Sequence, residues 1–157
     1  MMTVPGCRSL LVALAALAWS AAAIAGEVRV DDAWVRATLP GQKVAGVYMT
    51  LTSDVGGRLV AVESAAAPSA EIHEMRHQDG VMKMRRIESL DLPAGQAVKL
   101  APGGFHIMLM DIGQQLQAGQ EVSLDLVVEE AGKRRTIPVK APVRAAAGGA
   151  GGGHEHH

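Results

Sequence analysis

Histidine and methionine are concentrated in one part of this chain. The sequence holds six histidines and eight methionines, and five of those methionines fall between positions 75 and 110. Three histidines lie beside them, so that the cluster comprises His73, Met75, His77, Met82, Met84, His106, Met108 and Met110. Thioether and imidazole together suit Cu(I), whereas zinc prefers thiolate, imidazole and carboxylate, and calcium and magnesium prefer oxygen. The cluster therefore indicates a site for Cu(I).

Strand periodicity predicts which of these side chains share a face. Side chains two positions apart on a strand point the same way. His73 and Met75 therefore form one pair, and Met82 and Met84 form another. The last strand of the cluster is expected to present two sets, with His106, Met108 and Met110 on one side and Phe105, Ile107 and Leu109 toward the core.

A turn signal predicts how two of these strands meet. The dipeptide Asp79-Gly80 is typical of a tight hairpin turn. Such a turn would fold the strand of His73 back against the strand of Met84 and bring these two side chains close together. A neighbouring strand that carries His106 and Met108 would complete a set of two imidazoles and two thioethers.

The remaining members of the cluster have simpler expected roles. A methionine in a β core is usually a flexible filler of gaps. Met75, Met82 and Met110 are therefore expected to pack near the ligands or to support them from behind. His77 lies beside the turn and is expected to be solvated, and Met49 is expected to serve folding only.

The elements that must position these residues are all strands. Short runs of strand-forming residues are separated by turn signals rich in glycine, proline and aspartate. The predicted strands are 28–35, 44–51, 59–63, 71–76, 81–86, 98–100, 106–110, 122–128 and 135–139. Their number and spacing favour a single all-β domain, a sandwich or Greek-key barrel.

The first 25 residues are typical of a secretory signal peptide. Arg8 is their only charge, an apolar run follows it, and Ala23-Ile24-Ala25 forms a small-x-small cleavage site. The apolar run is shorter than the ~20 residues that span a bilayer. We therefore expect a periplasmic protein, monomeric and with no membrane span, whose copper-binding domain covers residues 26–143.

Cleavage would remove Cys7, the one cysteine of the chain. The mature domain would then have no disulfide and no thiolate ligand. It would carry 14 basic residues, after the loss of Arg8 from 15, against 16 acidic residues, a net charge of −2. Nucleic-acid binding needs a basic footprint and is excluded on this ground.

Residues 144–157 differ in composition from the domain. They are rich in glycine and alanine, which predicts a flexible linker, and they end in a group of histidines. Imidazole suits Cu(II), so His154, His156 and His157 are candidates for a second copper site. An unspecific metal-scavenging tail and an expression remnant are the alternatives.

Three segments of the chain resemble a known family. They are Val44-Ala-Gly-Val-Tyr-Met-Thr-Leu, Glu71-Ile-His-Glu-Met with Val81-Met-Lys-Met-Arg, and Pro102-Gly-Gly-Phe-His-Ile-Met-Leu-Met. They are similar to periplasmic copper chaperones of the PCuAC (copper A chaperone) type. The signature of that family is His, ten residues, Met, twenty-one residues, His, one residue, Met, and His73, Met84, His106 and Met108 match it at all four positions.

The resemblance implies both a fold and a function. It implies a cupredoxin-like β-barrel that binds Cu(I) through these four side chains. It further implies delivery of copper to the copper A centre of cytochrome c oxidase, often together with a thioredoxin-like Sco-type partner. Some members of this family also carry an extension rich in histidine and methionine, which the tail of this chain resembles.

Competing functions differ in the residues they need. A blue-copper electron carrier needs an equatorial cysteine thiolate, which the mature domain would lack. A copper oxygenase of the histidine-brace type needs an amino-terminal histidine, and a serine hydrolase needs a nucleophile motif; neither is present. A copper buffer without a dedicated partner would use the same four ligands, and it stays open as the alternative to a chaperone.

Overall fold

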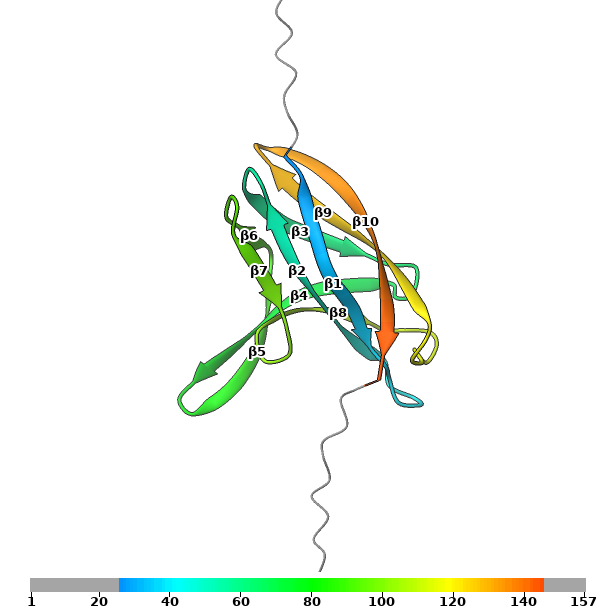
Figure 1. Ribbon diagram of the computed structural model, residues 1–157. Coiled ribbons are helices and arrows are strands. Elements are labelled where there is room, and N and C mark those ends of the chain that lie inside the picture. The colour runs from blue at the N-terminus through cyan, green and yellow to red at the C-terminus, as the bar shows by residue number, and fades with distance from the viewer. Residues whose placement is uncertain (1–25, 146–157) are drawn as a thin grey trace, which may run out of the picture.

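The computed structural model describes residues 26–145, and all regular secondary structure in this range is β (Figure 1). Ten strands follow one another along the chain. They are β1 (Val28–Arg36), β2 (Val44–Ser53), β3 (Gly57–Glu63), β4 (Ser69–Gln78), β5 (Val81–Ile87), β6 (Leu90–Leu92), β7 (Ala97–Leu100), β8 (Phe105–Met110), β9 (Glu121–Glu130) and β10 (Lys133–Arg144). No helix long and apolar enough to cross a membrane occurs within residues 26–145.

Nine of these strands confirm the predicted ones, with small differences at their ends. The strand missed by sequence analysis is β6, whose three residues are too few to show an alternation. The prediction also ended β10 at Val139, although the strand continues to Arg144. Two prolines interrupt the pattern there, Pro138 and Pro142. They are tolerated because β10 pairs with β9 over residues 133–142 and with β1 only at its end, so one edge is open beside them.

The strands form one hydrogen-bonded sheet that wraps around a core. Its order is β5-β4-β8-β7-β2-β1-β10-β9-β3-β6, and β8 also pairs with β2. The half from β5 to β1 and the half from β10 to β6 face each other in a barrel-like wrap (Figure 1). The parallel pairing of β1 with β10 joins the two halves.

Alternate side chains of the strands point inward and fill the space between the two halves. On β9, Val122, Leu124 and Leu126 are each less than 5% exposed, while the residues between them face solvent. These residues form the buried face of β9. On β8, Ile107 and Leu109 are completely buried. The opposite side of β8 is thereby left to carry other chemistry.

The hairpin of β4 and β5 projects from the body of the molecule (Figure 1). Its turn is the predicted one, since Gln78 pairs with Val81 and only Asp79 and Gly80 lie between them. Both turn residues have positive φ, 53° and 77°. That is the type I′ geometry, in which aspartate followed by glycine is favoured. The projecting end of the hairpin carries side chains with little packing around them.

Some predictions fall on residues outside the described range. The signal peptide, residues 1–25, is one of them. The tail histidines His154, His156 and His157 are the other. Both stay predictions.

Substitution of Leu109 tests the assignment of the inner face of β8. We expect Leu109→Ala to lower the free energy of unfolding by about 2–5 kcal/mol, because it leaves a cavity in a closely packed core. Leu39→Ala is the matched control, since Leu39 is 73% exposed, and it should cost less than about 0.5 kcal/mol. Urea denaturation measures both. Equal losses would contradict the assignment.

Candidate metal centre

Two of the predicted ligands, His73 and His106, lie directly opposite each other on β4 and β8. Their ring centroids are 5.5 Å apart and the rings meet edge to face, at 71°. Both residues project from the outer side of the sheet, yet they are only 7% and 6% exposed. The fold therefore brings two shielded imidazoles together at a position where side chains usually meet water.

His106 keeps one ring nitrogen available to a metal. Its Nδ1 donates a hydrogen bond to the carbonyl oxygen of Gly104, 3.2 Å away, which leaves the lone pair on Nε2. Burial lowers the pKa of His106, and the nearby His73 lowers it further, although the bond to Gly104 opposes this. The ring therefore stays neutral over a wider pH range, as a metal-binding imidazole must.

His73 is held by a carboxylate that sequence analysis did not single out. Its Nε2 lies 2.7 Å from Oε2 of Glu71. That hydrogen bond, and then the charge of Arg86, hold the pKa of Glu71 below its usual value, against the effect of desolvation. The other nitrogen of His73, Nδ1, is buried and has no hydrogen-bond partner. A buried polar atom without a partner is costly, and a metal ion would remove that cost.

The signal for Glu71 was present in the sequence. Glu71 stands two positions before His73, so the two side chains share a face of one strand. Carboxylates that hydrogen-bond to a metal-binding histidine orient the ring and raise its basicity.

Met108 lies on the same face as the two imidazoles. It is two positions beyond His106 on β8, where it pairs with Glu71 of β4 on one side and with Gly46 of β2 on the other. Its side chain is half-buried. A thioether therefore borders the imidazole pair on the strand that also carries His106.

Met84 lies farther out, on the projecting hairpin. It pairs with Met75, whereas the residue opposite His73 is Arg86. Met84 is thus a diagonal neighbour of His73, at the ~7–8 Å that separates such pairs and within reach of a long side chain. It is 50% exposed. The thioether of Met84 is the most accessible of the four predicted ligands.

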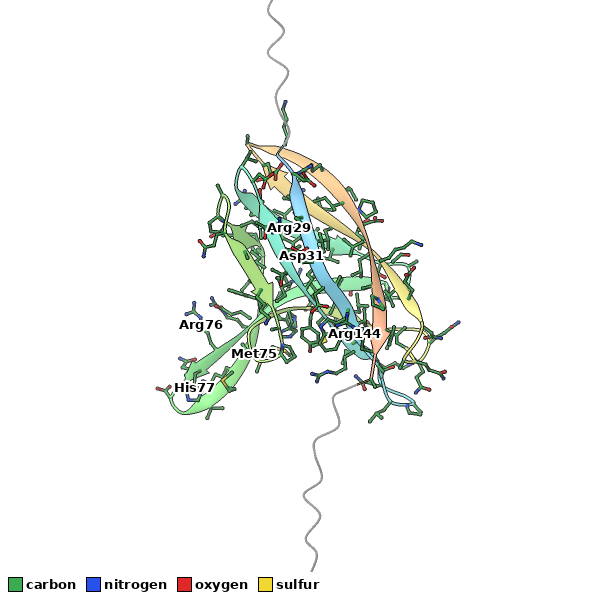
Figure 2. The ribbon with its side chains drawn as sticks, in the orientation of Figure 1. Arg29, Asp31, Met75, Arg76, His77 and Arg144 are labelled. Carbon is green, nitrogen blue, oxygen red and sulfur yellow. The ribbon has the colours of Figure 1, made fainter. Side chains whose placement is uncertain are left out.

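The other methionines and His77 continue this face. Met75 is half-buried between His73 and the turn, and Met110 is half-buried at the far end of β8. Met82 is 46% exposed and pairs with His77. Figure 2 shows Met75 at the base of the hairpin and His77 toward its tip.

Two aromatic residues that the sequence did not mark border the site on its other side. Tyr48 lies next to His106, with ring centroids 6.4 Å apart, and Trp34 lies 4.7 Å from Tyr48. The guanidinium of Arg36 covers the ring of Tyr48 at 5.6 Å, and that of Arg144 covers Trp34 at 5.9 Å. Tyr48 therefore borders His106 directly, and the other three side chains pack around Tyr48 and Trp34.

A bulge in β1 explains why Trp34 packs against Tyr48 on the outer face of the sheet. The register with β2 shifts between Asp31 and Trp34, where Asp32 has a φ of 49°. Before the bulge Val28 and Val30 point inward, and after it Val35 does. The extra residue reverses the phase of the alternation, as bulges do, and turns Trp34 outward against Tyr48. A simple period of two does not predict this.

The donor set suits a soft ion better than a hard one. Within residues 26–145, no group of three or more His, Cys, Asp or Glu side chains is placed to hold a metal. A site here consequently needs sulfur from methionine in addition to the two imidazoles. Neutral nitrogen and thioether donors fit Cu(I), and the buried Nδ1 of His73, which bonds to no protein group, is a donor atom available to such an ion.

Sequence comparisons relate the chain to a lipoprotein family. The family described as "Putative lipoprotein LpqE-like" matches residues 28–143. The "Putative lipoprotein Lxx21020" of Leifsonia xyli subsp. xyli is 36% identical over 118 residues, which are 74% of this chain and 69% of that protein.

Solved structures resemble the whole described domain. The copper-bound PCuAC domain from PmoF2 is 31% identical with a TM-score of 0.62, over 78% of this chain and 96% of that domain. The solution structure of CuI-DR1885 from Deinococcus radiodurans is 32% identical with a TM-score of 0.62, over 81% of this chain and 85% of that one. The predicted all-β, cupredoxin-like fold is confirmed.

Substitution of Gly46 tests whether this glycine makes room for the Tyr48 ring beside His106. A Cβ at this position would lie 2.6 Å from the hydroxyl of Tyr48, so Gly46→Ala should displace the Tyr48 ring. We expect the ring resonances of Tyr48 and His106 to shift in the NMR spectrum of this variant. Gly113→Ala is the control, because a Cβ there meets no atom within 4 Å. Unchanged ring resonances in Gly46→Ala would show that Tyr48 does not rest on this glycine.

Proposed function

This chain belongs to the LpqE-like family, and we propose that it is a copper metallochaperone that binds Cu(I) through His73, Met84, His106 and Met108. It delivers the ion to the copper A centre of cytochrome c oxidase, directly or with a Sco-type thioredoxin-like partner. The observation that carries the proposal is the shielded His73–His106 pair, in which each ring keeps a nitrogen free.

The similar solved structures support copper as the cargo. One is a copper-bound PCuAC domain and another is a Cu(I) form of DR1885. Both are more than 30% identical to this chain and match most of its described domain. We infer the same cargo for this chain because its imidazole and thioether groups are all available on one face.

The division of the ligands suits a carrier rather than a permanent cofactor site. The two imidazoles are buried and held by hydrogen bonds, so they pre-organise half of the coordination sphere. Met84 is half-exposed on a projecting hairpin. A partner can therefore approach Cu(I) from that side and replace the thioether first.

The same donors argue for binding rather than catalysis. Cys7 is the single cysteine of the chain, so the domain has no thiolate for a blue-copper centre. Four neutral ligands stabilise Cu(I) and leave it one net positive charge. We therefore propose a binding protein without enzymatic activity.

Export to the periplasm completes the proposal. The description of the family as a lipoprotein and the amino-terminal sequence both agree with a protein that acts outside the cytoplasm. Cleavage of a signal peptide near Gly26 is part of this proposal.

Removal of single ligands tests the coordination. We expect His106→Ala and Met84→Ala each to weaken Cu(I) binding by roughly 100-fold or more, since loss of a ligand costs more than loss of a supporting group. Competition with a Cu(I) chelator measures this. Met49→Ala is the control, because Met49 is 2% exposed in the core and should change stability alone. If the double variant His106→Ala/Met84→Ala keeps the wild-type affinity, the ligand assignment is wrong.

Glu71 allows a graded test of the support behind His73. Glu71→Ala should weaken Cu(I) binding by about 10–100-fold, because it frees the His73 ring to rotate. Glu71→Gln keeps an acceptor for the His73 N–H and should lose less. Glu88→Ala, at an exposed position beyond β5, serves as the control. Equal affinities for Glu71→Ala and the wild type would remove Glu71 from the site.

A transfer experiment separates a chaperone from a buffer. Cu(I)-loaded protein is mixed with the apo copper A domain of the oxidase or with an apo Sco-type protein. We expect copper to appear on one acceptor, faster than from a Cu(I) chelate of equal affinity. Absence of transfer to both, with normal oxidase activity in a deletion strain, would favour the buffer instead.

A further inference from the structure

We propose that the tip of the β4–β5 hairpin holds a second, weaker Cu(I) site formed by His77 and Met82, from which the ion passes along the hairpin to the main site. The inference rests on the proposed copper function and assigns a role to the two residues of the cluster that lie farthest from the imidazole pair. The transfer is a ligand exchange in which copper stays Cu(I).

The contact between His77 and Met82 is the first observation. They pair across the two strands, and Nδ1 of His77 lies 3.2 Å from Sδ of Met82. A thioether sulfur is a weak hydrogen-bond acceptor, whereas imidazole nitrogen and thioether sulfur are both good ligands of Cu(I). The two donor atoms therefore already face each other, in a part of the hairpin that is open to solvent.

Exposure argues against a packing role for these methionines. Met82 and Met84 are 46% and 50% exposed, whereas Met49 in the core is 2% exposed. Of the five large apolar side chains exposed among residues 26–145, three lie on β5, the third being Val81. An exposed methionine contributes little to stability through burial. We therefore assign these two methionines a role as sulfur ligands.

The pair is one end of a continuous row of donors. The rungs of this face, from the tip to the body, are His77 with Met82, Met75 with Met84, and then His73 with His106 across the next strand. Neighbouring rungs are two residues apart, which is ~6.6 Å along a strand. The long side chains of Met75 and Met84 can bridge this interval. Every rung thus offers at least one thioether or imidazole donor.

The charges of the hairpin are arranged to spare this row. Arg76, Lys83 and Arg85 belong to the rungs of the opposite face, where Arg76 and Arg85 both bind Glu74. Arg86 shares the face of the donors, and its guanidinium binds Glu71 at 3.3 Å. On the donor face the arginine is thus paired with a carboxylate, and the other cations of the hairpin project from the opposite face.

Uptake kinetics test the proposal. We compare wild-type protein with His77→Ala/Met82→Leu, which removes both donors and keeps an apolar side chain on β5. Cu(I) is supplied as a chelate, anaerobically, and uptake is followed by the loss of the chelate's colour. We expect the rate to fall at least about fivefold while the equilibrium affinity changes less than about twofold. The control is Gln78→Ala/Val81→Leu, the adjacent rung on the opposite face, which should match the wild type.

A second measurement isolates the new site. In His106→Ala/Met108→Leu, which lacks half of the main site, Ag(I) as a soft stand-in for Cu(I) should shift the Met82 methyl and His77 ring resonances. Adding His77→Ala/Met82→Leu should abolish binding at the tip. Unchanged uptake rates, or Met82 and His77 resonances that do not move, would overturn this inference and leave the proposed function intact. Wild-type protein that binds no Cu(I) would overturn the proposed function itself.

Discussion

The register between β4 and β8 is the constraint on which the site depends. Ile72 pairs with Ile107 on the inner face, and the next pair, His73 with His106, faces outward. A slip of one residue would exchange the two faces and place the imidazoles in the core. Burial of the two isoleucines makes that slip costly. The apolar core thus fixes the face that carries the imidazoles, although its own side chains lie on the opposite side of the sheet.

Shielded imidazoles on an outer face need compensation, and the fold supplies it locally. Gly104 and Glu71 each occupy one ring nitrogen by hydrogen bonding. Trp34 and Tyr48 cover the neighbouring surface, which requires both the β1 bulge and the absence of a side chain at Gly46. Both rings are largely buried, and each keeps one nitrogen without a hydrogen bond to the protein. Binding of a soft cation stabilises a buried, unpaired nitrogen more than a nitrogen that already bonds to water.

Period-two alternation, the Asp79-Gly80 turn and the spacing of the ligands were enough to predict nine strands, the hairpin and the inner side of β8. They were not enough for the parts that depend on how strands align. The bulge at Asp32 reverses the phase of β1, and the pairing of β4 with β8 sets His73 opposite His106. Both depend on contacts between distant segments, which a single strand's pattern does not contain. Glu71 was missed for a different reason. Its place on the face of His73 follows from the sequence, but its hydrogen bond to His73 does not.

The proposed ligands differ in exposure, and this difference bears on how a carrier can both bind copper selectively and release it. The nitrogen half is buried between β4, β8 and β2, where packing and hydrogen bonds hold each ring. The thioether of Met108 lies beside them on β8, whereas that of Met84 lies on a hairpin that packs on one side only, through β4. In the proposed carrier, buried donors lose little entropy on binding, whereas the exposed donor is the one that a partner can reach. A site built wholly from buried ligands would hold copper well but would offer an acceptor no ligand to displace.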